Sequence, residues 1–406
     1  MGRISRARAV PTRAETHRAT PFEIFFDLVF VFALTRIIDF MGHPPTFRSM
    51  GQGLLLLVLI WFSWAAYTWL GNQVRADVGV IRAGTLLAMA ALFVAALVMP
   101  DAWHSDHVGM AAPLILVGAY VALRLVHFLL YYRVAVDDPR VRARLRWIAV
   151  PIVLAWIPLV LGAVYGGTAQ TLLWLLSLLI DIGGQRIALA IAGGWQLRSP
   201  NHFSERHGLA LIIALGLSLI SVGAGAGTAA ARAPVLFAAL LGLTVTVCLW
   251  SLCFDRVGPA AARALAGATG SRRVQIASDA YSLAYLLLVS GIIYLALGIG
   301  QVVEHLAHKQ PDSSGGEPLS WASTTALFGG VALHLTGRLL SVWFSVRSAP
   351  PAQLGTVVVT LLLLPVGRML PALAALGLVV AVLVVAVGFE RLTHRSEPAD
   401  ATDRAG

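Results

Sequence analysis

Long apolar stretches separated by short polar loops dominate the chain. Twelve of these stretches approach the roughly 20 residues that a helix needs to cross a bilayer. The pattern predicts an all-α polytopic membrane protein with about twelve transmembrane helices. The expected spans are residues 22–40, 50–70, 83–100, 110–132, 147–165, 170–192, 207–226, 233–253, 279–300, 321–345, 353–367 and 369–390.

Composition agrees with this class, because 58% of the residues are hydrophobic and only 12% are charged, with a mean hydropathy of +0.79. The formal net charge of +10 does not indicate nucleic-acid binding, since the arginines lie in short loops between apolar runs and form no basic domain interleaved with aromatic residues. The predicted partner is the lipid bilayer. Cys248 and Cys253 share one expected span, so we expect no disulfide framework.

The basic residues are distributed unevenly between the two sides of the membrane. Most arginines fall in the terminal tails and in alternate loops that would share their side, whereas the opposite loops hold few. Lysine and arginine concentrate on the cytoplasmic side of membrane proteins. We therefore expect a bacterial plasma (inner) membrane protein with both termini in the cytoplasm and a first span that is not a removable signal peptide.

The two halves of the chain resemble each other. Leu123–Arg133 in the fourth span matches Gly337–Arg347 in the tenth, and Pro21–Glu23 matches Phe203–Glu205 ahead of spans one and seven. A duplicated six-helix unit keeps its orientation, so the halves would be two parallel repeats. The expected parts are a basic cytoplasmic tail (1–20), a first repeat (21–200), a second repeat (201–395) and a disordered tail (396–406).

Glu23 and Asp27 are the most informative polar residues, because they stand four apart at the start of an apolar helix and share one face. Ionisable groups inside a membrane are costly, so they are commonly paired or functional. Two interpretations follow: the pair holds the bundle together through arginines, or it forms a cation or proton site. We favour the structural role.

Arg124 and Arg338 are the expected counter-charges, since the repeat places both at one depth and lipid exposure would be costly. We expect Asp27 to contact Arg124, Arg338 or both, and the arginines to set the pKa and orientation of the acids. The alternative is that the arginines extend towards the headgroups.

Two further polar groups are candidates for the same solute or ion path. Asp181 and Arg186 flank Gly183-Gly184 in the sixth span, which favours either a helix break or an early helix end. Glu205, Arg206 and His207 lie at the cytoplasmic entry of the seventh span. The preferred role there is capping, in which Ser204 caps the helix and Glu205 stabilises its positive end, and the alternative is a His207 that titrates near neutral pH.

Histidines and carboxylates also gather in two outer loops. One group is Asp101, His104, Asp106 and His107; the other is Glu304, His305 and His308. Such residues can bind zinc, but exposed loops commonly collect them, and we predict no metal site. No cofactor is predicted either.

Phe22–Thr35 resembles the opening signature of the bacterial low temperature requirement A family. The resemblance extends to Trp174–Asp181, Glu205–Leu209 and Trp250–Asp255, and so covers nearly the whole chain. It implies a multipass inner-membrane protein but supplies no reaction. Phe25–Ala33 is also distantly similar to the first-helix Phe-Ser-Asp motif of the lysosomal potassium channel family, which favours conduction or transport.

The chain departs from the family pattern in two spans. Members usually carry a glutamate where Leu217 stands, and a histidine and a proline where Tyr285 and Leu287 stand. Loss of the glutamate and the histidine removes groups able to carry protons.

Signatures of enzymes are missing, including the Walker A loop, His-Glu-x-x-His and Gly-x-Ser-x-Gly. We therefore predict no enzyme. The favoured function is movement of a small solute or cation between the two six-helix repeats. The alternative is a non-transporting scaffold or stress-adaptation protein with purely structural ion pairs, which the leucine at 217 favours. A wet cavity or interrupted helices would favour transport, and a dry, closed core would favour a scaffold.

Overall fold

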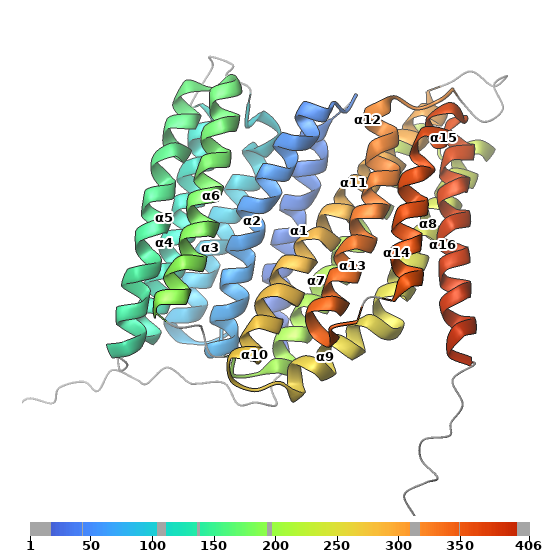
Figure 1. Ribbon diagram of the computed structural model, residues 1–406. Coiled ribbons are helices and arrows are strands. Elements are labelled where there is room, and N and C mark those ends of the chain that lie inside the picture. The colour runs from blue at the N-terminus through green and yellow to red at the C-terminus, as the bar shows by residue number, and fades with distance from the viewer. Residues whose placement is uncertain are drawn as a thin grey trace, which may run out of the picture. The chain divides into compact units, whose positions relative to one another are not determined.

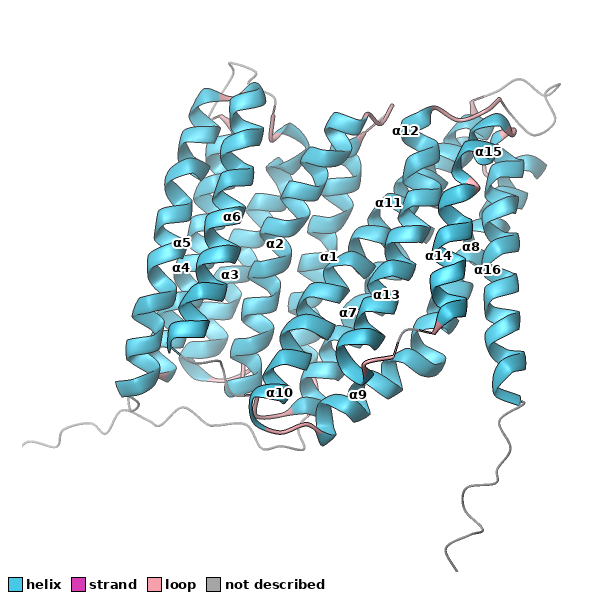
Figure 2. Ribbon diagram, in the orientation of Figure 1, coloured by secondary structure: helices cyan, strands magenta, loops and turns pink. Residues whose placement is uncertain are grey.

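The computed structural model describes residues 18–42, 44–103, 111–135, 139–192, 197–308, 317–348 and 350–395. The expectations for a basic tail before residue 18 and a disordered tail after residue 395 lie outside these residues. Within them every regular element is a helix, as the uniform helix colour of Figure 2 shows.

Eleven helical segments of the described chain are long and apolar enough to cross a membrane. The prediction of an all-α multipass membrane protein is therefore confirmed. Helix α1 (Pro21–Met41) would be the twelfth span. It is 21 residues long but carries Glu23, Asp27, Arg36 and Asp39, so composition alone does not identify it.

The chain divides into two compact units. Unit 1 comprises Met1–Ile213 and Ala262–Leu283, and unit 2 comprises Ala214–Ala261 and Ala284–Gly406. The arrangement as two six-helix repeats, with a boundary at residue 200, stays a prediction.

Unit 1 is built from long helices that run side by side, with α5 packed along α6 and α3 along α4 (Figure 1). Its elements are α1, α2 (Phe47–Gln73), α3 (Gly79–Val98), the 3-10 turn η1 (Met99–Asp101), α4 (Ala112–Val134), α5 (Pro139–Tyr165), α6 (Gly167–Ala192), the first part of α7 (Pro200–Ala226), α10 (Gly270–Gln275) and the π-helical segment η4 (Ile276–Leu283).

Local signals start the first two helices. Thr20 and Glu23 form a reciprocal capping box with Pro21 in the first turn of α1, and Thr46 and Ser49 do the same for α2. Each cap satisfies backbone N–H groups that the first helical turn leaves without partners. The cap fixes the register of α1, and hence the face on which Glu23 and Asp27 lie.

Unit 2 has α11 and α13 at its centre. Its elements are the remainder of α7, the 3-10 turn η2 (Gly227–Ala229), α8 (Ala233–Leu252), the π-helical segment η3 (Cys253–Val257), α9 (Gly258–Gly267, shared with unit 1), α11 (Ala284–Ala307), α12 (Trp321–Thr324), the π-helical segment η5 (Thr325–Gly329), α13 (Gly330–Val346), α14 (Pro351–Leu362), α15 (Leu364–Met369) and α16 (Ala372–Arg395).

The expected eleventh span, residues 353–367, is interrupted. Helix α14 ends at Leu362 and α15 begins at Leu364, with Pro365 in its first turn. Proline has no backbone N–H to donate and its ring clashes with the preceding turn, so a continuous helix does not form there.

Candidate functional site

Asp27 on α1 pairs with Arg206 on α7. The carboxylate oxygen Oδ1 accepts hydrogen bonds from Nη2 of Arg206 at 3.0 Å and from Nε1 of Trp64 at 2.7 Å. All three side chains are buried. The arginine also lies over the rings of Phe26 and Trp64, within 6 Å of each centroid. The positive charge thus contacts the carboxylate of Asp27 and two aromatic faces.

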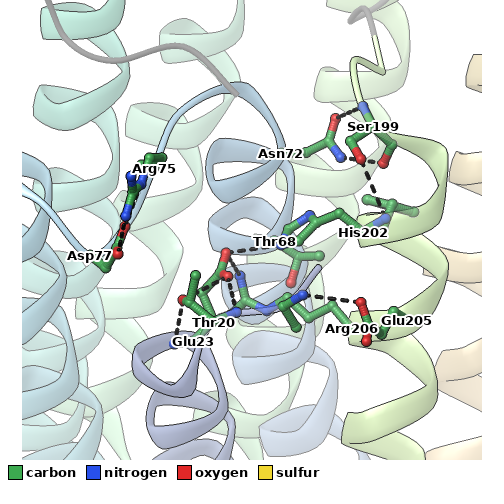
Figure 3. A network of polar contacts seen from close by, with 12 residues as sticks. Thr20, Glu23, Thr68, Asn72, Arg75, Asp77, Ser199, His202, Glu205 and Arg206 are labelled. Atoms are coloured by element: carbon green, nitrogen blue, oxygen red, sulfur yellow. Dashed lines mark hydrogen bonds and ion pairs between the residues drawn. The ribbon is translucent and has the colours of Figure 1, made fainter. Parts of the chain in front are cut away.

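Glu23 joins the helix cap to the same arginine. Its oxygen Oε2 accepts from the backbone N–H and the hydroxyl of Thr20, both at 2.9 Å. The other oxygen, Oε1, lies 3.1 Å from Nε2 of His202 and 3.7 Å from Nη1 of Arg206 (Figure 3). We call Glu23, Asp27, His202 and Arg206 the acid–arginine cluster.

The acid–arginine cluster is closely packed. Two carboxylates face one guanidinium, and a proton on His202 would bring the sum of charges to zero. The cavity beside Glu23 and Arg206 has a volume of about 10 Å³, at the lower limit for one water. Among the described residues, Oδ2 of Asp27 has no hydrogen-bond partner. Such a closed ion pair holds helices together but offers a solute no room.

Gly71 on α2 permits this close approach. A Cβ atom there would lie 2.8 Å from Oε1 of Glu23 and 3.1 Å from Nη1 of Arg206. Any side chain would push the acid and the base apart, so the position requires the smallest residue. Nearby, Arg75 and Asp77 form a separate, more exposed pair at 2.7 Å, and this hydrogen bond raises the pKa of the Arg75 guanidinium (Figure 3).

His207, one residue further along α7, is enclosed by aromatic rings. Its ring centroid lies 4.4 Å from that of Phe203, 5.0 Å from that of Trp64 and 5.4 Å from that of Tyr281. Its Nδ1 donates to the carbonyl of Phe203 at 2.9 Å. The sequence placed His207 at the entry of a span, whereas the structure buries it completely.

A second polar region of unit 1 surrounds a cavity of about 930 Å³. We call it the arginine cavity, because Arg124, Arg186 and Arg273 line it together with one carboxylate, Asp279. Its remaining wall is largely apolar. The apolar lining includes Phe62, Phe128, Leu145, Ile148, Ile152 and Ile182.

The prediction that Asp27 contacts Arg124 or Arg338 was wrong. Arg124 instead pairs with Asp181, whose two oxygens each lie 3.3 Å from its Nη2, and both side chains are buried. Arg338, in unit 2, pairs with Glu390 at 2.7 Å and donates from Nε to the carbonyl of Leu252. In the sequence, several arginines at a similar depth in the membrane were equally good candidates for the partner of Asp27. Only the packing of the helices decides which of them forms the pair.

The sixth span continues through Gly183-Gly184 without a break, since α6 runs to Ala192. A Cβ on Gly184 would lie 2.3 Å from that of Pro151, so this glycine serves close packing of α6 on α5. The two flanking charges have different partners. Asp181 holds Arg124, and Arg186 lies 3.2 Å from Asp279 of η4.

The expected capping role of Glu205 was wrong, because α7 begins at Pro200 and not after Ser204. Ser199 lies at the helix start, where its hydroxyl accepts from the N–H of His202. Glu205 instead accepts from the N–H of Ala19 at 3.0 Å. This contact ties the segment before α1 to the first turns of α7.

His104, Asp106 and His107 of the first histidine loop lie outside the described residues. In the second loop, Nδ1 of His308 bonds the carbonyl of Glu304, and Nε2 of His305 accepts from the N–H of Glu317. Within the described chain, no three metal-ligating side chains come together.

Sequence reasoning missed His202 and Arg206 as partners of the two acids. A signal was present: His202 and Arg206 are four apart at the start of one helix, as Glu23 and Asp27 are at the start of another. Two matched pairs at helical spacing can interlock face to face.

Comparison with known proteins gives a family. The model of the family described as "Bacterial low temperature requirement A protein (LtrA)" matches residues 18–388. An uncharacterized protein of Rhizobium meliloti (strain 1021) is 24% identical over 343 residues, which cover 81% of this chain and 78% of the relative. No solved structure matches the chain. Because the family match spans far more than half of the sequence, and includes both the acid–arginine cluster and the arginine cavity, the chain belongs to the bacterial low temperature requirement A (LtrA) family.

Proposed function

We propose that this membrane protein moves a small solute or ion across the bacterial inner membrane, as a carrier or channel and not as an enzyme. The arginine cavity is the observation that supports the proposal. Its volume of about 930 Å³ falls in the range of small-molecule sites, which are mostly apolar with a few convergent polar groups. A path between two six-helix repeats stays a prediction.

Helix irregularity beside the cavity adds support. Ser278, Asp279 and Ser282 line it from η4, a π-helical segment. π-Helical turns are rare and occur frequently at functional sites. The carbonyl of Ser282 accepts from Nε1 of Trp61 at 2.7 Å, so a side chain of α2 supports the irregular segment.

The acid–arginine cluster has a structural role in this proposal. It is closed and nearly without free volume, as expected for the alternative, a non-transporting scaffold. The two interpretations therefore apply to different parts of unit 1. The cluster fixes α1, α2 and α7 against each other, and the arginine cavity takes the solute.

Filling the arginine cavity should stop flux. Ala190 of α6 lines it and is exposed, so Ala190→Trp adds bulk there without removing a buried contact. We expect protein in liposomes to take up radiolabelled rubidium ion or benzenesulfonate faster than empty liposomes. Ala190→Trp should lower that uptake at least about tenfold, because the indole occupies the space that binding requires.

Ala190→Ser is the matched control and should transport like the wild type. Uptake of neither probe above the rate of empty liposomes would contradict the proposal and support the scaffold. Uptake unchanged by Ala190→Trp would show that the solute takes another path.

The distribution of basic residues supports a cytoplasmic location for both termini. We expect green fluorescent protein fused after residue 406 to fluoresce in bacteria, because it folds in the cytoplasm, and alkaline phosphatase at the same position to be inactive. The reverse result would contradict this orientation.

A further inference from the structure

We propose that the arginine cavity binds an amphipathic monoanion, that is, a carboxylate, sulfonate or phosphate group attached to an apolar body. The inference rests on the proposed function in that it names the substrate class of the same cavity. It is carried by the charges that line the cavity and by the apolar wall opposite them.

The charges that line the cavity favour a ligand with a single negative charge. Arg124 is balanced by Asp181 and Arg186 by Asp279. Arg273 has no carboxylate partner among the described residues, since its guanidinium donates to the carbonyls of Ala268 and Ala266. Among the described residues, one half-buried positive charge beside the cavity is thus left without a carboxylate partner, and such a charge attracts an anion.

Arg124 offers further hydrogen-bond donors to the cavity. Within the described residues its hydrogen bonds to Asp181 come from Nη2, while its side chain, only 4% exposed, also lines the cavity. Nε and Nη1 have no recorded partner there. Asp181 is further held by Nε2 of Gln185, which also lines the cavity, so the arginine is fixed in place. Guanidinium N–H groups suit carboxylate and phosphate oxygens.

The apolar wall favours a hydrocarbon body. Ile148 and Ile152 of α5 belong to one packed cluster with Ala188 of α6, and both isoleucines line the cavity. Phe62 and Phe128 face it from α2 and α4. A fully hydrophilic anion would leave this surface in contact with water, whereas an acyl chain or aromatic ring would cover it.

Trp69 provides a reporter, because it lines the cavity. We would place the full-length protein in phosphatidylcholine nanodiscs and titrate it with 11-bromoundecanoate, whose bromine quenches nearby tryptophans. The signal is the part of the fluorescence quenching that disappears in the Trp69→Phe variant. We expect this Trp69-dependent quenching to saturate with 11-bromoundecanoate. The neutral 11-bromoundecanol should give no saturable Trp69-dependent quenching.

Arg273→Gln should weaken binding of 11-bromoundecanoate about tenfold, since it removes the unbalanced charge. Arg272→Gln is the matched control, because it makes the same change one residue away at a side chain that does not line the cavity, and it should keep the wild-type affinity. Arg124→Gln is a poorer test, because it would leave Asp181 buried without its counter-charge.

Two further probes distinguish the source of the anion. Saturable quenching by 4-bromobenzoate would support a soluble ligand, and quenching by brominated phosphatidylglycerol in the nanodisc would support a lipid. Equal binding of the alcohol and the carboxylate, unchanged affinity in Arg273→Gln, or no Trp69-dependent quenching by any anion would overturn the inference. Binding without liposome flux would refute transport alone, and rubidium flux without anion binding would refute the substrate class alone.

Discussion

Arg206→Gln is expected to destabilise the folded protein by about 3–5 kcal/mol, as found when one partner of a buried ion pair is removed. The arginine is 2% exposed and contacts both Glu23 and Asp27. Without it, two buried carboxylates would lose the guanidinium that both of them contact. The apparent melting temperature in detergent, followed by size-exclusion chromatography after heating, should fall by roughly 10 °C or more.

Asp27→Asn should cost much less, about 1 kcal/mol. An asparagine oxygen can still accept from Trp64 and Arg206, and Glu23 remains as the counter-charge of the arginine. The two changes are therefore unequal although they break the same ion pair. Adding Asp27→Asn to Arg206→Gln should recover part of the lost stability, because it removes one of the two unbalanced acids.

Asp39→Asn is the control on the same helix. Asp39 pairs with Arg36, and its side chain is 50% exposed, so solvent screens the pair and the change should cost less than about 1 kcal/mol. If Arg206→Gln proved no less stable than Asp27→Asn, charge balance would not be what stabilises the cluster.

The helices could be predicted from the sequence, because each apolar run is long enough for a helix that crosses a bilayer and too long for a buried β-strand. Their ends could not always be predicted. The polar segment 200–206 reads as a loop before the seventh span, yet it forms the first turns of α7. Its charged side chains pair with residues of α1. Hydropathy is summed over neighbouring residues, so it does not detect a partner that is distant in the sequence.

The sequence was sufficient to predict that the candidate site contains buried ion pairs, but not which residues pair with each other. Glu23 and Asp27 were identified because two acids four apart in an apolar helix need a partner. Which arginine supplies it depends on how α7 is rotated and how closely α2 approaches, and Gly71 decides the latter. The arginine cavity could be predicted from the sequence even less. In the sequence Arg273 is one basic residue of a loop, and only the fold shows that it lines the same cavity as Arg124.

Glycines set the contact between α11 and α13 in unit 2, and one of them carries the second large expected effect. Gly291 and Gly298 stand seven apart on α11, and Gly330 and Gly337 stand seven apart on α13. A Cβ on any of the four would lie 2.4–2.7 Å from a backbone atom of the facing segment, which for Gly298 is Leu327 of η5, the π-helical segment directly before α13. Small residues at regular spacing are a common means of bringing membrane helices into close contact.

Gly291→Ala should therefore destabilise unit 2 by about 3 kcal/mol, the upper part of the range for overpacking. The added Cβ would lie 2.4 Å from the amide nitrogen of His334 and 2.6 Å from the carbonyl oxygen of Gly330. Backbone atoms cannot rotate away as a side chain would, so α13 must move back and lose its contacts along α11. The loss should appear although alanine is the better helix former by about 1 kcal/mol.

Gly377→Ala isolates that helix preference within the same unit. Gly377 lies inside α16, and nothing lies within 4 Å of the position where its Cβ would be. This variant should melt at the wild-type temperature or slightly above it, whereas Gly291→Ala should melt roughly 10 °C lower. Equal melting of the two alanine variants would mean that α11 and α13 tolerate separation, and that close backbone contact does not stabilise unit 2.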